Sequence, residues 1–222
     1  MFAGSTRVAG EQLKPMRLSF FDIDCHPSEH LDLGDDPWNL YDVSAERSLV
    51  LIGRQHYHGV GSVEWDVAAQ DTNTRKLVAR FPPLEKARFA DRGKAVCGVG
   101  GAQWHRTVEC MEVDTGNRLG VTTGWNAPDV RTAPRAKRVV VSDYSRKLDW
   151  IDAVSRLGSL KRRVVWDFET GKQLASWRPR SQTVPQGGPY RQSLPFVFAM
   201  SPDGEYVVEG GAGTLALYKI EP

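Results

Sequence analysis

The chain has 222 residues, a quarter of them charged, and a formal net charge of +2. This length allows one large domain or two small ones with a sizeable core, and the composition is that of an ordinary globular protein. No run approaches the roughly 18 uninterrupted apolar residues that a membrane-spanning helix needs, and the first residues lack the basic and apolar regions of a signal peptide. The sequence therefore predicts a soluble protein with no membrane span, and nothing in it directs export.

The three cysteines, Cys25, Cys97 and Cys110, are too few and too far apart in the sequence for a disulfide framework. One of them must stay unpaired in any case. A reducing compartment is the simpler expectation, so we predict a cytoplasmic protein.

The charge is unevenly distributed along the chain. Residues 131–191 carry 14 Lys and Arg against 5 Asp and Glu, whereas residues 1–130 carry 14 against 18 and residues 192–222 carry 1 against 4. Such a basic segment can bind nucleic acid or an acidic protein. Solvated strand edges and loops explain it more simply, because scattered Lys and Arg also protect edges from aggregation.

A pair formed by a large side chain and an acid recurs at the end of alternating runs. It occurs as Phe21-Asp22, Trp65-Asp66, Met111-Glu112 and Trp166-Asp167, and Tyr218-Lys219 occupies a fifth such place. The separations are 44, 46, 55 and 52 residues. A period of this length indicates an array of supersecondary units.

Each unit predicts four short strands joined by tight turns. An apolar strand is followed by a polar turn such as "SPDG" (201–204), then by a buried apolar run such as "AVCGV" (95–99). An alternating strand with the large-acid pair comes next, and turns such as "DTGN" (114–117) lead to an outer strand. Four meandering antiparallel strands are the blade of a β-propeller, so we predict an all-β propeller.

Two stretches resemble WD40 repeats. "VVWDFETGKQLASW" (164–177) has the Trp-Asp pair, and "FAMSPDGEYVVEGG" (198–211) has Asp203 and Gly204 in the turn between its first two strands. The Gly-His pair of that family is absent, and Met111-Glu112 replaces Trp-Asp in one unit. The resemblance implies a divergent WD40-like or quinoprotein-like propeller, a platform for binding rather than one particular chemistry.

We expect one propeller domain, or part of one, over residues 1–222. The expected blades are approximately residues 1–34, 37–81, 84–124, 127–177 and 194–222, with the first and last incomplete. Either five blades close imperfectly, or the chain is the C-terminal portion of a longer propeller, which we favour. An open arc would expose unpaired edge strands, through which copies can self-associate.

Strand direction divides the connections between two faces of the expected propeller. Because successive strands alternate in direction, first-to-second and third-to-fourth turns share one face, and all the long connections fall on the other. The candidates for binding a partner lie on or beside that long-loop face: Trp38, His56, His58, Trp104, His105, Trp125, Trp150 and Tyr190. Aromatic loop residues are typical of interfaces, but packing within the propeller is an equal alternative for this set.

We predict no catalytic residue, metal site or cofactor. His56 and His58 lack a third ligand at a defined spacing, and His105 and Cys110 would lie on opposite faces of a regular strand. The sequence thus favours a non-catalytic scaffold that binds a protein partner through its long-loop face. The alternatives are a propeller enzyme, such as a quinoprotein-like dehydrogenase or a metal-dependent lactonase, and a binder of nucleic acid or acidic protein through residues 131–191.

Overall fold

The computed structural model describes residues 2–5, 17–21, 26–32, 38–57, 63–101, 106–125, 128–144, 161–178, 197–211 and 214–221. These residues form five antiparallel sheets, each a meander of consecutive strands. The predicted all-β propeller is confirmed, with four strands in each of the three central sheets and three in each flanking sheet.

The strands follow one another along the chain without crossovers. The first sheet contains β1 (Phe2–Ser5), β2 (Arg17–Phe21) and β3 (Pro27–Asp32), and the second contains β4 (Trp38–Ser44), β5 (Leu49–Tyr57), β6 (Val63–Asp71) and β7 (Leu77–Phe81). The third contains β8 (Glu85–Ala90), β9 (Ala95–Gly100), β10 (Arg106–Glu112) and β11 (Arg118–Trp125). The fourth contains β12 (Asp129–Thr132), β13 (Arg138–Tyr144), β14 (Lys161–Asp167) and β15 (Gln173–Trp177), and the fifth β16 (Val197–Met200), β17 (Tyr206–Gly211) and β18 (Thr214–Lys219).

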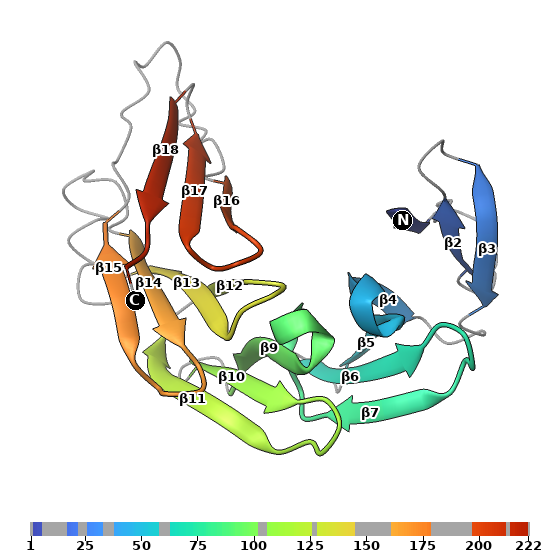
Figure 1. Cartoon of the computed structure of the whole chain (residues 1–222). Coiled ribbons are helices and arrows are strands. Elements are labelled where there is room, and N and C mark those ends of the chain that lie inside the picture. The colour runs from blue at the N-terminus through green and yellow to red at the C-terminus, as the bar shows by residue number, and fades with distance from the viewer. Residues whose placement is uncertain are drawn as a thin grey trace, which may run out of the picture.

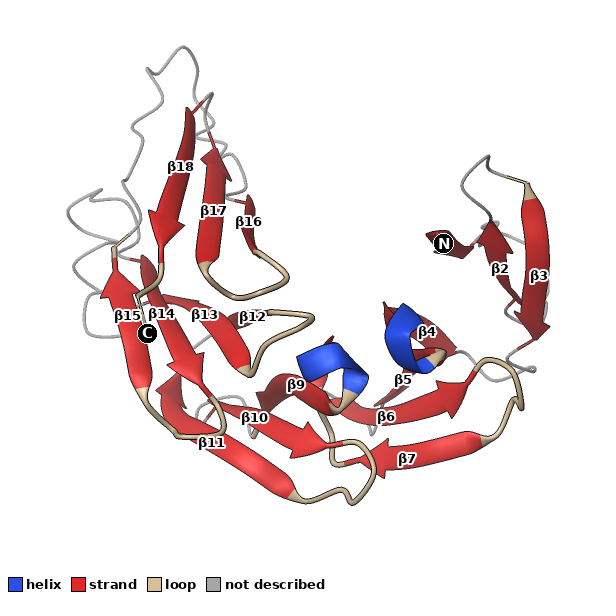
Figure 2. Ribbon diagram, in the orientation of Figure 1, coloured by secondary structure: helices blue, strands red, loops and turns tan. Residues whose placement is uncertain are grey.

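The five sheets lie side by side along an open arc (Figure 1). The outer strands β7, β11 and β15 follow its convex side, and β4, β12 and β16 lie toward the inside. Two short 3-10 helices, η1 (Ala45–Arg47) and η2 (Asp91–Gly93), join the first two strands of the second and third sheets and lie close together near the inner side (Figure 2).

The core consists of three clusters, one between each pair of neighbouring sheets from the second to the fifth. We call the side of a sheet that packs on the next sheet along the chain its forward face, and the opposite side its backward face. All six residues of β9 are buried, because this strand has a neighbouring sheet on both sides. The unbroken apolar run "AVCGVG" therefore suits a strand covered on both faces.

One cross-strand pair marks the centre of each forward face. These equivalent pairs are Leu51–Ala69, Cys97–Cys110, Val140–Val165 and Val208–Leu217 in the second to fifth sheets. In the second, third and fourth sheets the pair is buried in the cluster shared with the next sheet.

Cys97 and Cys110 form a disulfide bond across β9 and β10, with their Cα atoms 4.1 Å apart. The sequence predicted no disulfide framework and did not indicate this single bond. Thirteen residues separate the two in sequence, but they are directly opposite each other in the strand register. The disulfide removes the argument for a reducing compartment, because such bonds persist mainly in oxidising ones.

Candidate functional site: the two faces of the propeller

The third-to-fourth strand turns share one hydrogen-bonded design. The Asp71 carboxylate accepts hydrogen bonds from the backbone N–H groups of Asn73 (2.9 Å) and Thr74 (2.6 Å). Asp167 accepts equivalent bonds from Glu169 (3.0 Å) and Thr170 (2.9 Å). In the third sheet the Glu112 carboxylate instead accepts a bond of 2.6 Å from the Thr115 hydroxyl. An acid at the first turn position thus holds each of these three connections, and the two Asp turns have the Asx hydrogen-bond pattern.

This design shows which acids are equivalent. Glu112 and Asp167 belong to the large-acid pairs of the predicted repeat, but their counterpart in the second sheet is Asp71. Asp66, predicted from the Trp65-Asp66 pair, lies inside β6 opposite Arg54, and its Oδ2 atom is 3.0 Å from the Arg54 guanidinium. The Trp-Asp dipeptide was mistaken for the repeat position because β6, with nine residues, is longer than β10 and β14.

The "SPDG" turn has the tight geometry that its sequence predicts. The Asp203 carboxylate accepts bonds from the Ser201 hydroxyl (2.5 Å) and the Glu205 N–H (3.0 Å), and the Ser201 hydroxyl bond lowers the pKa of Asp203. Gly204 has a φ of +74°, and a Cβ atom there would lie 2.8 Å from Cδ of Arg138. This position therefore requires glycine for both its backbone conformation and the space around it.

Main-chain hydrogen bonds link the first-to-second strand turns of neighbouring sheets. The Arg92 N–H donates to the Pro134 carbonyl (2.5 Å), and the Arg135 N–H donates to the Pro202 carbonyl (2.8 Å). Donor and acceptor occupy the same turn positions in both links. These bonds join the third, fourth and fifth sheets on what we call the turn face, defined by these turns and the acid-capped ones.

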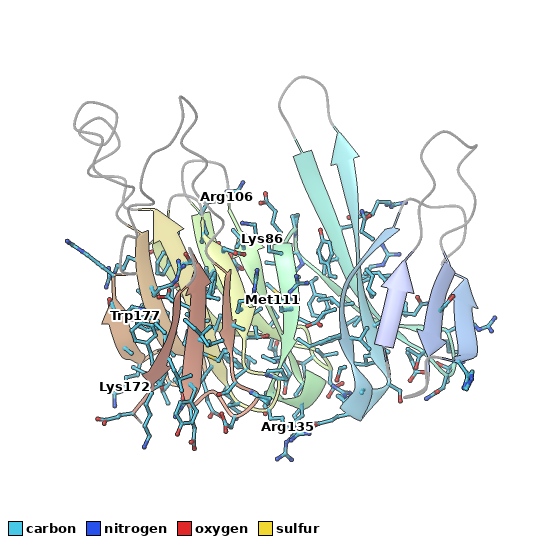
Figure 3. All side chains as sticks on the ribbon, turned by 90° about the horizontal axis from the view of Figure 1, so that it is seen from above. Lys86, Arg106, Met111, Arg135, Lys172 and Trp177 are labelled. Atoms are coloured by element: carbon cyan, nitrogen blue, oxygen red, sulfur yellow. A yellow bond between two sulfur atoms is a disulfide. The ribbon has the colours of Figure 1, made fainter. Side chains whose placement is uncertain are left out.

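Ion pairs add to the links on the turn face. Arg47 of the second sheet contacts Asp114 of the third (2.6 Å), and Arg135 of the fourth contacts Glu46 of the second (2.9 Å). Arg135 and Lys172 lie toward the same edge of the molecule in Figure 3. Exposed pairs of this kind contribute roughly 0–1 kcal/mol each, so they orient the turns more than they stabilise the fold.

The opposite face, which we call the loop face, has its own charged rim at the strand ends. Arg106, at the start of β10, contacts Glu85, at the start of β8 (2.7 Å). Lys86 donates to the Pro128 carbonyl (3.1 Å) and lies 3.9 Å from Asp129 in the next sheet. Lys86 and Arg106 lie on the side away from Arg135 and Lys172 (Figure 3).

Side chains from both neighbouring sheets complete the bonding of the inner strand β8. The Asp42 carboxylate accepts a bond from the Phe89 N–H (2.8 Å), and the Thr132 hydroxyl donates to the Phe89 carbonyl (2.5 Å). Burial raises the pKa of Asp42, although hydrogen bonds from the Phe89 and Val43 N–H groups oppose the shift. Burial also raises the pKa of the neighbouring Tyr41 well above its usual value. Asp42 and Thr132 thus hold the inner edge of the third sheet. The alternation of residues along the strands does not predict these contacts.

The structure places three of the predicted partner-binding residues. Trp38 begins β4 opposite Arg54, and His56 pairs with Glu64 across β5 and β6. Trp125 ends β11 and is buried in the cluster between the third and fourth sheets, where its indole N–H donates to the Thr122 hydroxyl (2.8 Å). Trp125 was expected in a loop, but the longer strand turns it into the core. The others, His58, Trp104, His105, Trp150 and Tyr190, lie outside the described residues.

The repeat positions are placed mainly in the core and the turns. Met111 is buried against the second sheet, and Trp166 packs against the cluster shared with the third. Tyr218 stacks on Trp177 with ring centroids 4.7 Å apart. Phe21 ends β2, whereas Asp22 lies outside the described residues.

Within the part of the chain that the structure describes, no group of three or more His, Cys, Asp or Glu side chains could hold a metal ion. Over the same residues, no helix is long and apolar enough to cross a membrane.

Many cations of the basic segment 131–191 have partners. Arg131 contacts Asp129 (3.0 Å), Lys137 contacts Glu169 (2.5 Å), and Arg138 donates to the Gly204 carbonyl (3.1 Å). The hydrogen bond that Lys137 donates to Glu169 raises the pKa of Lys137. These cations already have partners within the chain, so they offer less positive charge to an acidic partner.

A buried ion pair between the fourth and fifth sheets was not predicted. Arg163, 1% exposed at its side chain, contacts Glu209, 6% exposed, at 2.6 Å. The Arg163 guanidinium also lies 4.4 Å from the centre of the Phe198 ring. Sequence alone did not reveal it because Arg163 reads as part of a solvated basic run. The signal was its place on the third strand, where the second and third sheets carry Val67 and Val108 and the fifth carries Leu215.

No protein-family model matches the sequence, and a search of curated proteins finds no match. Solved structures do resemble the fold. TolB from Acinetobacter baumannii is 16% identical with a TM-score of 0.57, over 98% of this chain and 50% of that one. The β-propeller domain of the Trilobed protease from Pyrococcus furiosus, with an open velcro topology, is 10% identical with a TM-score of 0.60, over 98% and 63%. The Dos1 propeller is 14% identical with a TM-score of 0.55, over 92% and 51%.

These likenesses establish the fold alone, because the identities are low. The chain spans between half and two thirds of the length of these propellers. The described residues thus form a divergent β-propeller arc with an interlinked turn face and a separate loop face.

Proposed function

We propose that the chain is a non-catalytic protein-interaction module that binds a protein partner through its loop face. The observation that carries the proposal is the asymmetry between the faces. On the turn face, short turns bond to one another through the Arg92–Pro134 and Arg135–Pro202 links. A rigid scaffold that presents longer connections on one face is the usual arrangement of binding proteins.

The rim of the loop face supports the same proposal. The Lys86–Asp129 and Arg106–Glu85 contacts fix the strand ends from which the connections start. Fixed anchor points lower the entropy that a loop loses on binding. The connection that leads to Arg106 contains Trp104, and the connection between β13 and β14 contains Trp150. Tryptophan is among the residue types that dominate interface energetics.

Affinity purification of the full chain from its native cells, with quantitative mass spectrometry, tests this proposal. A Trp104→Ala/Trp150→Ala variant should lose the proteins that co-purify specifically with the wild type. The matched control, Leu119→Ala/Val121→Ala, removes two exposed apolar side chains from the outer strand β11 and should retain them. Equal recovery with both variants would refute binding through the loop face.

A further inference from the structure

Over the residues that the structure describes, the second to fourth sheets bury the centre of their forward faces. The fifth sheet instead has exposed side chains at the centre of its forward face. Leu215 and Leu217 on β18 are 77% and 67% exposed. Their neighbours in the rows across the sheet are small or apolar: Gly210 lies opposite Leu215, and Val208 lies between Leu217 and Ala199.

The equivalent residues of the preceding sheets are buried. Val67 and Ala69, Val108 and Cys110, and Arg163 and Val165 occupy the two places of Leu215 and Leu217, and each is at most 3% exposed. In every case the covering group is the backward face of the next sheet. Leu215 and Leu217 thus occupy strand positions that the next sheet covers in the second, third and fourth sheets. In the fifth sheet nothing described covers them.

We propose that this surface, Ala199, Val208, Leu215 and Leu217, docks the backward face of a further blade-like β-sheet supplied from outside residues 1–222. The argument is continuity with the three sheet-to-sheet interfaces already present. A sheet packs about 10 Å from its neighbour and matches it side chain against side chain, so the geometry that repeats three times fits a fourth time.

The residue at position 215 also specifies the chemistry of the partner. Its equivalent, Arg163, is paired with Glu209 on the backward face of the fifth sheet. A leucine at this place cannot pair with a buried carboxylate, whose burial without a partner is strongly unfavourable. The docking sheet therefore has an apolar residue where the fifth sheet has Glu209, as the fourth sheet has in Val141.

The fourth sheet supplies a probe of that chemistry. Its backward face presents Val130, Val139 and Val141 to the Cys97–Cys110 and Val99–Val108 rows of the third sheet. We would extend the full chain at its C-terminus with a flexible linker and a second copy of residues 127–178. Maleimide labelling of Leu217→Cys, in a Cys25→Ser background, then reports cover at the docking surface.

The labelling rate at position 217 should fall at least tenfold in the extended protein relative to the unextended one. An extension with Val139→Asp and Val141→Asp in the added copy alone should restore the rate. As a remote control, Val121→Cys on β11 should react equally in all three proteins.

Three results would overturn the proposal. An unchanged rate at position 217 in the extended protein would show that the surface does not accept a blade. A rate that falls with concentration in the unextended chain, together with a dimer in sedimentation, would assign the surface to a second copy. A slow rate in the dilute unextended monomer would show that the chain covers this surface itself.

Discussion

The interface between the third and fourth sheets and the interface between the fourth and fifth have the same strand geometry but differ in chemistry at one buried position. The first is aliphatic, with the Cys97–Cys110 disulfide at its centre and Val139 and Val141 facing it. The second contains the buried Arg163–Glu209 pair beside Phe198. The strand geometry of a propeller thus fixes which positions of neighbouring sheets are in contact. The side chains at those positions determine which sheet can pack there.

Arg163→Ala tests the charged interface and should have the largest effect. It leaves the buried Glu209 carboxylate with the 3.5 Å bond from the Trp177 indole but without the guanidinium. Breaking a buried ion pair in this way costs about 3–5 kcal/mol of unfolding free energy. Urea denaturation followed by tryptophan fluorescence measures the loss. A loss of less than about 1 kcal/mol would show that water compensates the carboxylate.

The double variant Arg163→Leu/Glu209→Val converts this interface to the aliphatic type. Replacing a buried ion pair by apolar residues is often neutral or stabilising, so the double variant should be at least about 3 kcal/mol more stable than Arg163→Ala. A double variant as unstable as the single one would show that the pair cannot be exchanged for the chemistry of the preceding interface.

Reduction of the disulfide tests the aliphatic interface. The bond closes a loop of 13 residues in sequence separation, and such a crosslink contributes about 3 kcal/mol. Urea denaturation with and without a reductant measures this loss. Cys97→Val/Cys110→Val, which copies the Val140–Val165 pair, should be insensitive to the reductant, and Cys25→Ser should behave as the wild type. Alkylation of protein from its native cells would show whether the bond forms there.

Val165→Ala and Leu217→Ala compare a covered and an uncovered forward face. Val165 is buried in the cluster with the fifth sheet, so its truncation should cost about 2 kcal/mol through lost burial and a cavity. Leu217 is 67% exposed, and its truncation should change the unfolding free energy by less than about 0.5 kcal/mol. A large effect at Leu217 would mean that this face is covered in solution.

Removing the charge of an acid-capped turn should have the smallest effect on the unfolding free energy, and this effect should depend on pH. Backbone and hydroxyl hydrogen bonds from Thr74 lower the pKa of Asp71 below its usual 3.8. The stabilisation is therefore complete above pH 3.8 and is lost as the pH falls through the lower pKa of the folded state. Urea midpoints should separate the wild type from Asp71→Asn at neutral pH, and this difference should shrink in acid. A difference independent of pH would rule out the charge of Asp71 as its source.

The sequence was sufficient for the strands and the turns, because both depend on local chemistry. Alternation, apolar runs and the "SPDG" and "ETGK" turns predicted the meanders that the structure contains. The repeat register in the second sheet was not predicted correctly, since Trp65-Asp66 imitates the pair and Asp71 performs its role.

Contacts between sheets were beyond the sequence because they join residues far apart in the chain. Glu209 lies 46 residues from Arg163, and Asp42 lies 47 from Phe89. Trp125 was assigned to a loop because its neighbours favour a turn, and its burial depends on the extra length of β11. For Arg163 and Phe89 the deciding partner belongs to another sheet, where no local pattern can indicate it.

The links on the turn face have a consequence for which substitutions these turns tolerate. Arg92, Pro134, Arg135 and Pro202 contribute only peptide groups to them, and a proline suffices because only its carbonyl is used. Mutation can therefore replace the side chains of these turns while the links persist. These joints between sheets therefore depend on the path of the backbone and place few demands on which side chains the turns carry.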